Sequence, residues 1–383
     1  MNACLDVVIL SISGSVSYPF AELPQSLVKE MLEQSNGLSR DLSTSFKSII
    51  DQKDEFREKL EDFNFLQNES ELNFDKIYPT TCGIDGSFII ENLLSVDVLA
   101  VAGVAVEGLS PPTEVKHWPR PRHISKILTL THSDSSRQVA GALMMCMELE
   151  LALKAPHEVV FLDGSLSTPY VHFSKAINVI DKVPINLRDE FLKRFRQAID
   201  NYHHILHTSE NRIYVGVPKY TTKKEICSLL NLKNYEDRGV LSFVLEEGEF
   251  IIPKKMASPS ADIDTRSTEH YNTLKKTDDI LNDLYVIYYR PSKYFPVIRL
   301  ELMGSVAQDS RKLSILFETL KMQCNAPGMF EPFPLYLADR MVKHLRVALP
   351  ALRKAATQSI TRDWEGEISN LYLAMHGYRS KWG

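Results

Sequence analysis

Two aspartates of this chain stand in the same local sequence, Asp-Gly-Ser, at Asp85 and Asp163. Each follows a short apolar run, CGI before Asp85 and VVFL before Asp163. An Asp-Gly pair is typical of a turn that ends a strand, since both residues tolerate positive φ. A chain of this length and average composition would contain such a tripeptide about 0.1 times. Two Asp-Gly-Ser turns at strand ends therefore also predict a second role, as oxygen ligands for Mg²⁺ or Mn²⁺.

A third carboxylate is expected nearby, because cleavage of phosphodiesters by two metal ions uses about two to four carboxylates. Glu148 and Glu150 precede the apolar run that leads to Asp163. Being two residues apart on a helix, they point to different faces, so at most one of them faces the site. Glu148 follows three methionines in a largely apolar stretch, where a carboxylate is costly to bury unless it is paired or bound to metal. Glu148 is the candidate ligand, and Glu150 is expected on a solvated face.

Cationic side chains could contact a phosphate backbone at two places. Lys219 follows the apolar run YVGVP and is either a phosphate contact or an exposed loop lysine. Arg299 and Glu301 alternate in the sequence VIRLEL, which places them on one face of a strand. They flank the site or form a structural ion pair, and for Glu301 the ion pair is the more conservative interpretation.

The segment 116–126 contains four Lys or Arg residues and no acid. Together with Trp118 it could hold a single strand by phosphate contacts and base stacking. The alternative is a solvated, proline-rich loop. The residues predicted to contact nucleic acid here are Arg120, Arg122, Lys126 and Trp118.

The elements that must position these residues follow from the apolar patterns. Short runs rich in β-branched residues predict strands, and longer runs with helical spacing predict helices. The predicted strands cover 81–90, 96–106, 158–162, 212–217, 284–289 and 297–302, and the predicted helices cover 135–154, 187–205, 310–322 and 335–347. Strands that pair early and then alternate with helices indicate a mixed α/β sheet. A metal site is expected at the carboxyl ends of its strands.

Three further segments complete the predicted organisation. Residues 24–63 have helical spacing and predict a helical arm, broken near Asn36-Gly37. A polar helix is expected from about Lys223, and 253–279 is expected to be a loop or mobile insertion. The predicted domains are an N-terminal segment over 1–75, a core over 76–350 and a C-terminal helical tail over 351–383.

Composition narrows the functional classes. Net charge is −5 with a pI near 6.2, whereas a protein that holds DNA by bulk electrostatics is usually basic. No apolar run reaches the ~18 residues that would span a membrane, and the N-terminus lacks the basic start of a secretion signal. Five scattered cysteines without a C-x-x-C pair favour a reducing cytoplasm over a disulfide framework or zinc site. The sequence contains no phosphate-binding loop of the G-K-[S/T] type and no G-x-S-x-G, so neither an ATPase nor a serine hydrolase is expected.

An ordered set of motifs resembles the NurA family of archaeal and bacterial DNA repair nucleases. In chain order they are GIDGS, the E-x-E-x-A-L that begins at Glu148, VVFLDGSL, YVGVPK, YYRPSKYFPVIRLEL and PFPLYLADR. Together they cover roughly residues 80 to 345. The specificity lies in the order of the set, since no single motif is diagnostic.

The resemblance implies an RNase H-like mixed sheet core with the helical arm and helical insertions added to it. It implies a Mn²⁺-dependent (or Mg²⁺-dependent) site with 5′-to-3′ exonuclease and endonuclease activity on DNA. It also implies a homodimer that works with a HerA-like hexameric ATPase in DNA end processing, without a membrane.

Carried over residue by residue, the resemblance makes Asp85 the metal ligand of the first strand and Asp163 the second aspartate. Glu148 matches the helix glutamate of the family, with Glu150 as the alternative register. Asp339 falls where the family has a histidine or an acid, and His344 is a weak substitute for it. Asp85, Glu148, Asp163 and Asp339 are therefore the predicted catalytic and metal-binding set.

Two alternatives remain open at this point. The chain could be a catalytically weak or inactive subunit of the same fold that threads DNA or docks onto the ATPase, which the aspartate at position 339 and the acidic net charge would suit. It could also be another phosphoryl-transfer enzyme with the same carboxylates, such as an RNA nuclease.

Overall fold

The structure is a computed structural model that describes residues 20, 23–72, 78–93, 96–110, 116–207, 212–219, 221–232, 235–257, 268–326 and 328–363. The chain divides into two compact units, Met1–Glu55 and Phe56–Gly383. The first unit contains helix α1 (Gln25–Asp51), and helix α2 (Lys53–Asp62) begins at its end.

Helix α1 runs without interruption through Gly37, so the predicted break near Asn36-Gly37 is wrong. A glycine inside a helix costs only about 1 kcal/mol relative to alanine, which a long helix tolerates. The helical character predicted for 24–63 is confirmed. Exposed apolar side chains lie along α1 at Leu27, Met31, Leu38, Leu42 and Phe46.

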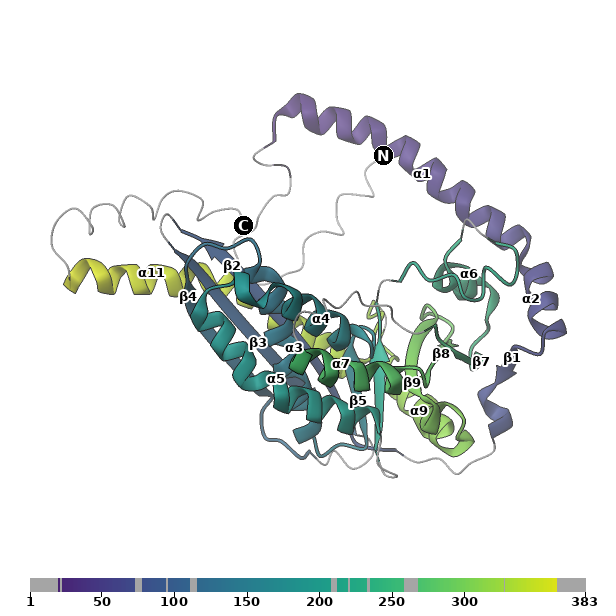
Figure 1. Ribbon diagram of the computed structural model, residues 1–383. Coiled ribbons are helices and arrows are strands. Elements are labelled where there is room, and N and C mark those ends of the chain that lie inside the picture. The colour runs from purple at the N-terminus through teal and green to yellow at the C-terminus, as the bar shows by residue number, and fades with distance from the viewer. Residues whose placement is uncertain are drawn as a thin grey trace. The chain divides into compact units, whose positions relative to one another are not determined.

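The second unit is built on one sheet of nine strands in the order β1-β7-β8-β9-β6-β5-β2-β3-β4 (Figure 1). Its strands are β1 (Leu66–Asn68), β2 (Thr81–Asn92), β3 (Asp97–Glu107), β4 (Arg122–Leu130), β5 (Val159–Asp163), β6 (Ile213–Val217), β7 (Glu249–Lys255), β8 (Leu284–Tyr289) and β9 (Ile298–Met303).

Five of these strands form the expected RNase H-like mixed core. β2, β3 and β4 pair antiparallel in chain order. On the other side of β2, strands β5 and β6 continue the sheet in parallel. The parallel strands are joined by helices, as parallel connections require. The predicted mixed α/β sheet is thereby confirmed.

The remaining strands extend the sheet beyond β6, all in antiparallel pairs. β1 pairs with β7, so the sheet includes residues before position 76. Three strands were not predicted: β1, which has only three residues, β4 and β7. β7 carries a proline and two lysines, and β4 carries Lys126 in an inward position of its alternation. Such residues weaken the apolar pattern from which strands are predicted.

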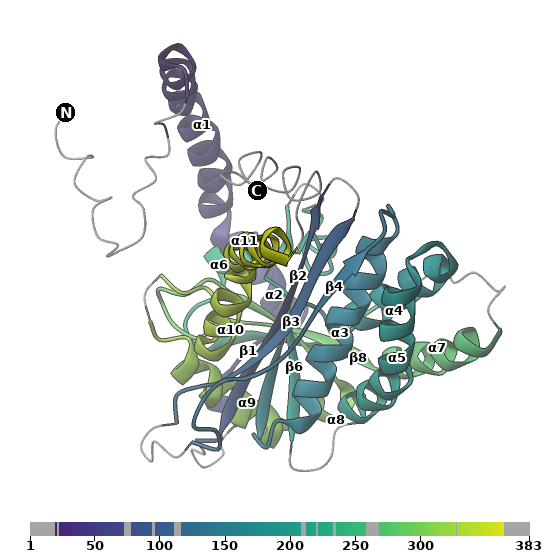
Figure 2. The same cartoon turned by 90° about the vertical axis from the view of Figure 1, so that its left-hand side faces the viewer.

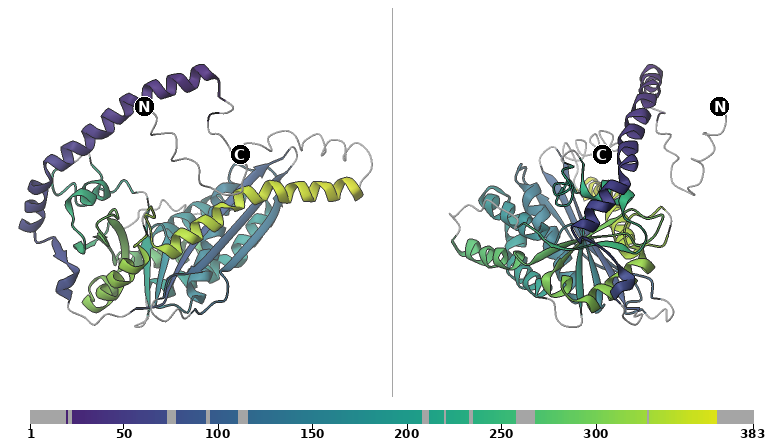
Figure 3. Two further views of the ribbon diagram at one scale, coloured as in Figure 1. Left: turned by 180° about the vertical axis from the view of Figure 1, so that it is seen from behind. Right: turned by 90° about the vertical axis from the view of Figure 1, so that its right-hand side faces the viewer.

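Helices cover both faces of the sheet (Figures 2 and 3). We call one side the α3 face; it carries α3 (Ser136–Lys154), α4 (Thr168–Val179), α5 (Ile185–Leu206) and α7 (Thr268–Leu281). The other, the α10 face, carries α9 (Ser310–Gln323) and α10 (Phe333–Lys343). Strand β5 shows the division, because Val160 and Leu162 lie in the core of the α3 face while Val159 and Phe161 lie in that of the α10 face.

Helix α7 contradicts the loop predicted for 253–279. Leu274, Thr277 and Leu281 are buried at helical spacing, and Leu274 and Leu281 join the core of the α3 face. The polar sequence around these positions hid the pattern. Residues 258–267 of that predicted insertion lie outside the described residues.

Helix α4 was not predicted, and the other long helices differ from expectation mainly in their bounds. The helix predicted from Lys223 begins at Asp237 as α6 (Asp237–Val244), and turns precede it. Helix α11 (Leu345–Asp363) begins the predicted C-terminal tail, whose residues 364–383 lie outside the described part. Short helical pieces are η1 (Glu69–Leu72), η2 (Ile180–Lys182) and α8 (Gly304–Ala307). No described helix is long and apolar enough to cross a membrane.

Candidate metal centre

Strand register brings Asp85 and Asp163 together. β2 and β5 run parallel with Ile84 opposite Leu162, so the next residue of each strand is one of the aspartates. Side chains alternate along a strand and neighbours in register point the same way. Phe161 belongs to the core of the α10 face, and therefore both carboxylates project on that side.

The two Asp-Gly-Ser copies are not equivalent. Asp163 is the last residue of β5, and Gly164 follows with φ +83°, the turn expected from the sequence. Asp85, by contrast, lies within β2, which continues to Asn92. The prediction of a turn at Asp85 is therefore wrong, and Gly86 needs another explanation.

A glycine on each side of Asp85 lets another element approach the strand. A Cβ at Gly83 would lie 2.3 Å from the backbone nitrogen of Leu335, so only glycine allows α10 to pack this closely on β2. Asp339 lies one turn beyond Leu335 and shares its side of α10. The close contact at Gly83 thus brings Asp339 to Asp85.

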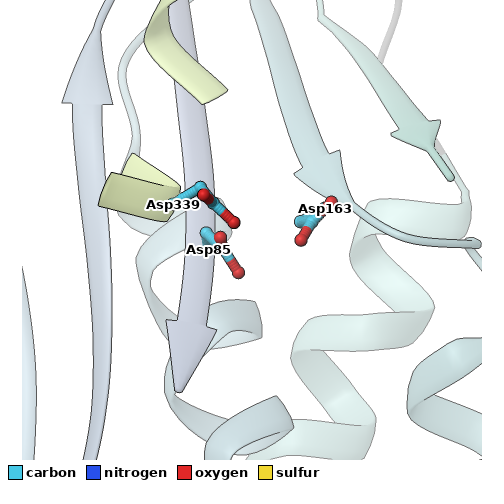
Figure 4. A group of neighbouring side chains, drawn as sticks. All are labelled: Asp85, Asp163 and Asp339. Carbon is cyan, nitrogen blue, oxygen red and sulfur yellow. The ribbon is translucent and has the colours of Figure 1, made fainter. Parts of the chain in front are cut away.

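The three aspartates form one cluster. Asp85, Asp163 and Asp339 each offer a carboxylate oxygen, and these oxygens lie within 4.8 Å of one another. Figure 4 shows the side chains converging from β2, the end of β5 and α10. Asp85 is only 6% exposed.

The electrostatics of this cluster favour a bound cation. Burial, and then the charge of Asp163, raise the pKa of Asp85 to about 8. Neighbouring carboxylates in a poorly hydrated site resist joint ionisation, and a divalent ion removes that resistance. A compact set of three hard oxygen donors suits Mg²⁺ or Mn²⁺.

A lysine lies at the centre of the cluster. The Nζ of Lys219 is 2.9 Å from Asp339 Oδ1, 3.3 Å from Asp163 Oδ2 and 3.9 Å from Asp85 Oδ2. Lys219 follows β6 two residues after Val217, which pairs with Asp163 and belongs to the core of the α10 face. The same alternation therefore directs all of these side chains to one side of the sheet.

Glu331 is a fourth acid of the site that sequence reasoning missed. Its Oε2 lies 2.9 Å from Lys219 Nζ, and burial raises the pKa of its carboxyl. The residue precedes Pro332, the N-cap of α10. The sequence could have pointed to Glu331, because this acid stands directly before the motif PFPLYLADR that contains Asp339.

Glu148 approaches the cluster from the α3 face. It is buried on α3, and a Cβ at Gly86 would lie 2.3 Å from its Oε1. Burial, followed by the charges of Asp85 and Asp163, holds the pKa of Glu148 well above its ordinary value. Its carboxylate lies outside the three-aspartate cluster but within electrostatic reach of it. Because Gly86 has no side chain, the Glu148 carboxylate can lie directly against β2 at this position.

The alternative acid and the weak substitute lie elsewhere. Glu150 pairs with Lys154 at 2.6 Å and with Arg194 at 3.1 Å, in line with a solvated helix face. His344 is the C-cap of α10 and is exposed.

Arg299 belongs to a buried network on the α3 face. Its guanidinium donates to Glu225 at 2.8 Å, to the hydroxyl oxygen of Tyr288 at 2.6 Å and to Glu301 at 3.1 Å. It is 1% exposed, so it presents no free edge to a phosphate, and the predicted nucleic-acid contact is not supported. The ion pair expected for Glu301 is present.

This network also supports the metal centre. Glu301 Oε2 accepts hydrogen bonds from the Ser165 hydroxyl and from the backbone N–H of Leu166. Ser165 belongs to the second Asp-Gly-Ser. Arg299 and Glu301 therefore fix the turn that follows Asp163.

The basic segment 116–126 is divided between a loop and an edge strand. Trp118 is buried and packs edge-on against His157, with ring centroids 4.7 Å apart, so base stacking by Trp118 is not supported. Lys126 lies on β4 and pairs with Glu190 at 3.2 Å. Arg120 and Arg122 are exposed and remain available to a phosphate backbone.

Comparisons with known proteins agree with this architecture. The NurA domain matches residues 79–344, which is more than half of the chain. No curated protein matches the chain at a significant level.

Solved structures share the fold at low sequence identity. The NurA nuclease from Sulfolobus solfataricus is 18% identical with a TM-score of 0.60, over 90% of this chain and 100% of that one. A NurA structure bound to dAMP and manganese is 13% identical with a TM-score of 0.51, over 83% of this chain and 97% of that one. A NurA structure with manganese is 11% identical with a TM-score of 0.50, over 84% and 98%.

Proposed function

The chain belongs to the NurA family, and from this premise we propose that it is a nuclease that hydrolyses DNA phosphodiesters with a divalent metal. One observation carries the proposal: three carboxylates from separate elements converge within 4.8 Å in a largely buried site. The similar NurA structure that is bound to dAMP and manganese supports the same chemistry here.

Asp85, Asp163 and Asp339 would hold Mn²⁺ or Mg²⁺. Bound there, the ion would activate water and stabilise the charge that develops on the phosphate. The residues of the chain supply the geometry. Glu301 holds the turn after Asp163, and Gly83 admits the helix that carries Asp339.

Glu148 is proposed as the fourth acid of the reaction. Its carboxyl is buried beside β2 and favours the protonated form in the metal-free protein. A cation held by the three aspartates would lower its pKa, and Glu148 is proposed to take up or release a proton during the reaction. Such general acid–base catalysis contributes about 10²- to 10⁴-fold.

The finer activity remains a proposal supported by the family resemblance. It comprises 5′-to-3′ exonuclease and endonuclease action on DNA in end processing, in repair or in defence against foreign DNA. The exposed cations Arg120 and Arg122 are proposed to contact the phosphate backbone. A HerA-like hexameric ATPase and a second copy of the chain are the proposed partners.

The test is cleavage of end-labelled DNA by the isolated chain. We expect degradation with Mn²⁺ and none with chelator, and a rate at least about a thousandfold lower for Asp85→Asn. Asp134→Asn is the matched control, because Asp134 is exposed and takes no part in the cluster. RNA of the same sequence in parallel reactions separates the DNA nuclease from an RNA nuclease.

A non-catalytic subunit is the second candidate. The observation that favours it is the ammonium of Lys219 among the carboxylates, 2.9 Å from Asp339 Oδ1. In that case the wild type and Asp85→Asn would be equally inert with Mn²⁺, and the nuclease proposal would be wrong.

A further inference from the structure

Lys219 is the feature of the site that metal binding alone leaves unexplained. Its Nζ is within 4.0 Å of carboxylate oxygens of four residues, Asp85, Asp163, Glu331 and Asp339. These four acids come from β2, the end of β5 and the region of α10, and one ammonium group serves them all. Charged groups are buried only when they are paired, and the side chain of Lys219 is 19% exposed.

The ammonium lies where a divalent ion would have to bind. The three aspartates that could share one ion are the same three that surround Lys219 Nζ. Two cations at contact distance from the same oxygens repel each other strongly in a poorly hydrated site. Lys219 and a divalent ion therefore cannot both occupy this position.

Hydrogen bonds hold the backbone at Lys219 in place, whereas its side chain can still change rotamer. Arg238 donates hydrogen bonds to the carbonyl oxygens of Lys219 and of Val297, which ties the end of β6 to the segment before β9. The lysine side chain retains several rotatable bonds and partial exposure, so a rotamer change alone would withdraw its Nζ from the carboxylates.

We propose that Lys219 is an internal counter-ion that occupies the metal position in the metal-free protein and withdraws when a divalent ion binds. It keeps the carboxylates together before metal arrives, and it lowers the affinity for the metal because the ion must displace it. The inference rests on the metal-binding part of the proposed function and is independent of cleavage.

Lys343 serves as the control for Lys219, because it is a second lysine that contacts Asp339. Its Nζ lies 2.6 Å from Asp339 Oδ2, but its side chain is 72% exposed. Lys219 contacts Oδ1 of Asp339, whereas Lys343 contacts Oδ2 and is not within contact distance of Asp85 or Asp163 in any ion pair of the described residues. Removing its charge should change metal affinity little, since exposed pairs are screened by solvent.

The test is direct titration of Mn²⁺ into the full-length protein without DNA, followed by calorimetry or by the electron paramagnetic resonance of free Mn²⁺. Lys219→Met should bind Mn²⁺ at least about tenfold more tightly than the wild type, and Lys343→Met should stay within about threefold. The metal-free Lys219→Met protein should also melt at a lower temperature than the wild type, and saturating Mn²⁺ should raise its melting temperature by more.

Equal or weaker Mn²⁺ binding by Lys219→Met would overturn the inference, and so would the absence of binding by both proteins. Lys219→Gln, which keeps a polar side chain, provides the same comparison if the methionine variant does not fold. Tighter binding by a variant whose wild type cuts no DNA would uphold this inference while refuting the nuclease proposal.

Discussion

At the scale of single residues, the centre places three carboxyl groups close together in a largely buried site. The carboxyl of Asp85 is nearly inaccessible, and it shares its surroundings with Asp163 and Asp339. Ionisation there is opposed first by burial and then by the charge of Asp163. The lysine among the carboxylates offsets part of this cost, and a divalent ion would offset more.

The stability of the metal-free protein should consequently depend on pH. The folded-state pKa of Asp85 is raised from 3.8 to about 8, so the folded state holds a proton that the unfolded chain releases near pH 4. Its contribution to stability is complete below pH 4 and is lost as the pH rises to about 8.

In the presence of chelator, the melting temperature of the wild type should therefore fall more between pH 5 and pH 8 than that of Asp85→Asn. Glu148 shifts in the same direction, so the variant should keep a smaller slope. Identical slopes for the two proteins would contradict the electrostatic description of the centre.

At the scale of elements, close packing positions the acids. Helix α10 reaches β2 over Gly83, and the Glu148 carboxylate reaches the same strand at Gly86. The two glycines of the motif CGIDGS therefore serve contacts on opposite faces of the sheet. Asp85 stands between them.

Gly83→Ala should push α10 away from β2, because its Cβ would meet the Leu335 backbone nitrogen at 2.3 Å. We expect a loss of about 1–3 kcal/mol in the free energy of unfolding and weaker Mn²⁺ binding, measured by denaturant titration and calorimetry. Gly239→Ala is the control, since nothing lies within 4 Å of its added Cβ on α6. It should be neutral or stabilising by about 0.4–1 kcal/mol. Unchanged Mn²⁺ affinity in Gly83→Ala would show that the close packing of α10 on β2 does not position the metal ligands.

Arg299 connects β9 with the turn after β5, and its removal should be costly. Arg299→Met would leave Glu225 and Glu301 without their shared cation, and breaking a buried ion pair costs about 3–5 kcal/mol. The free energy of unfolding should fall by about that amount. Lys154→Met removes a partner from the more exposed pair with Glu150 and should cost less than about 1 kcal/mol. Similar losses in both variants would show that the Arg299 network adds no special stability.

The sequence predicts the parts of this arrangement that depend on local pattern. Apolar runs locate β2, β3, β5, β6, β8 and β9, and the repeated tripeptide locates Asp85 and Asp163. Contacts between distant segments are not encoded locally. The lysine among the acids, Glu331 beside it and the burial of Arg299 follow from the pairing of β6 with β5 and the packing of α10. Polar residues within β4, β7 and α7 likewise conceal elements that tertiary packing stabilises.

At the scale of the whole molecule, the negative net charge opposes the binding of DNA, which the proposed reaction requires. A chain of net charge −5 with an acidic centre repels a polyanion, so local cations must hold the strand. The exposed arginines at 120 and 122 belong to the segment 116–126, which has four cations and no acid. Arg122 also lies 5.9 Å from the centroid of the buried Trp118 ring, which anchors this part of the loop.

Replacing both Arg120 and Arg122 by alanine should weaken binding of single-stranded DNA and flatten its dependence on salt. Removing one phosphate contact should reduce the slope of log K against log salt by about 0.7. The measurement is fluorescence anisotropy in chelator, where we expect no cleavage, with Arg188→Ala on α5 as the control. A slope equal to that of the wild type would remove this segment from the DNA path.

The carboxylates on the α10 face are proposed to hold the metal with which the chain cleaves DNA. The most direct measurement is anomalous diffraction at the manganese edge from crystals grown with Mn²⁺. We predict a manganese peak within about 2.5 Å of carboxylate oxygens of Asp85 and Asp163, with Lys219 Nζ displaced from them. Saturating Mn²⁺ without a peak at these aspartates, or with the only peak elsewhere, would show that these carboxylates do not hold the metal.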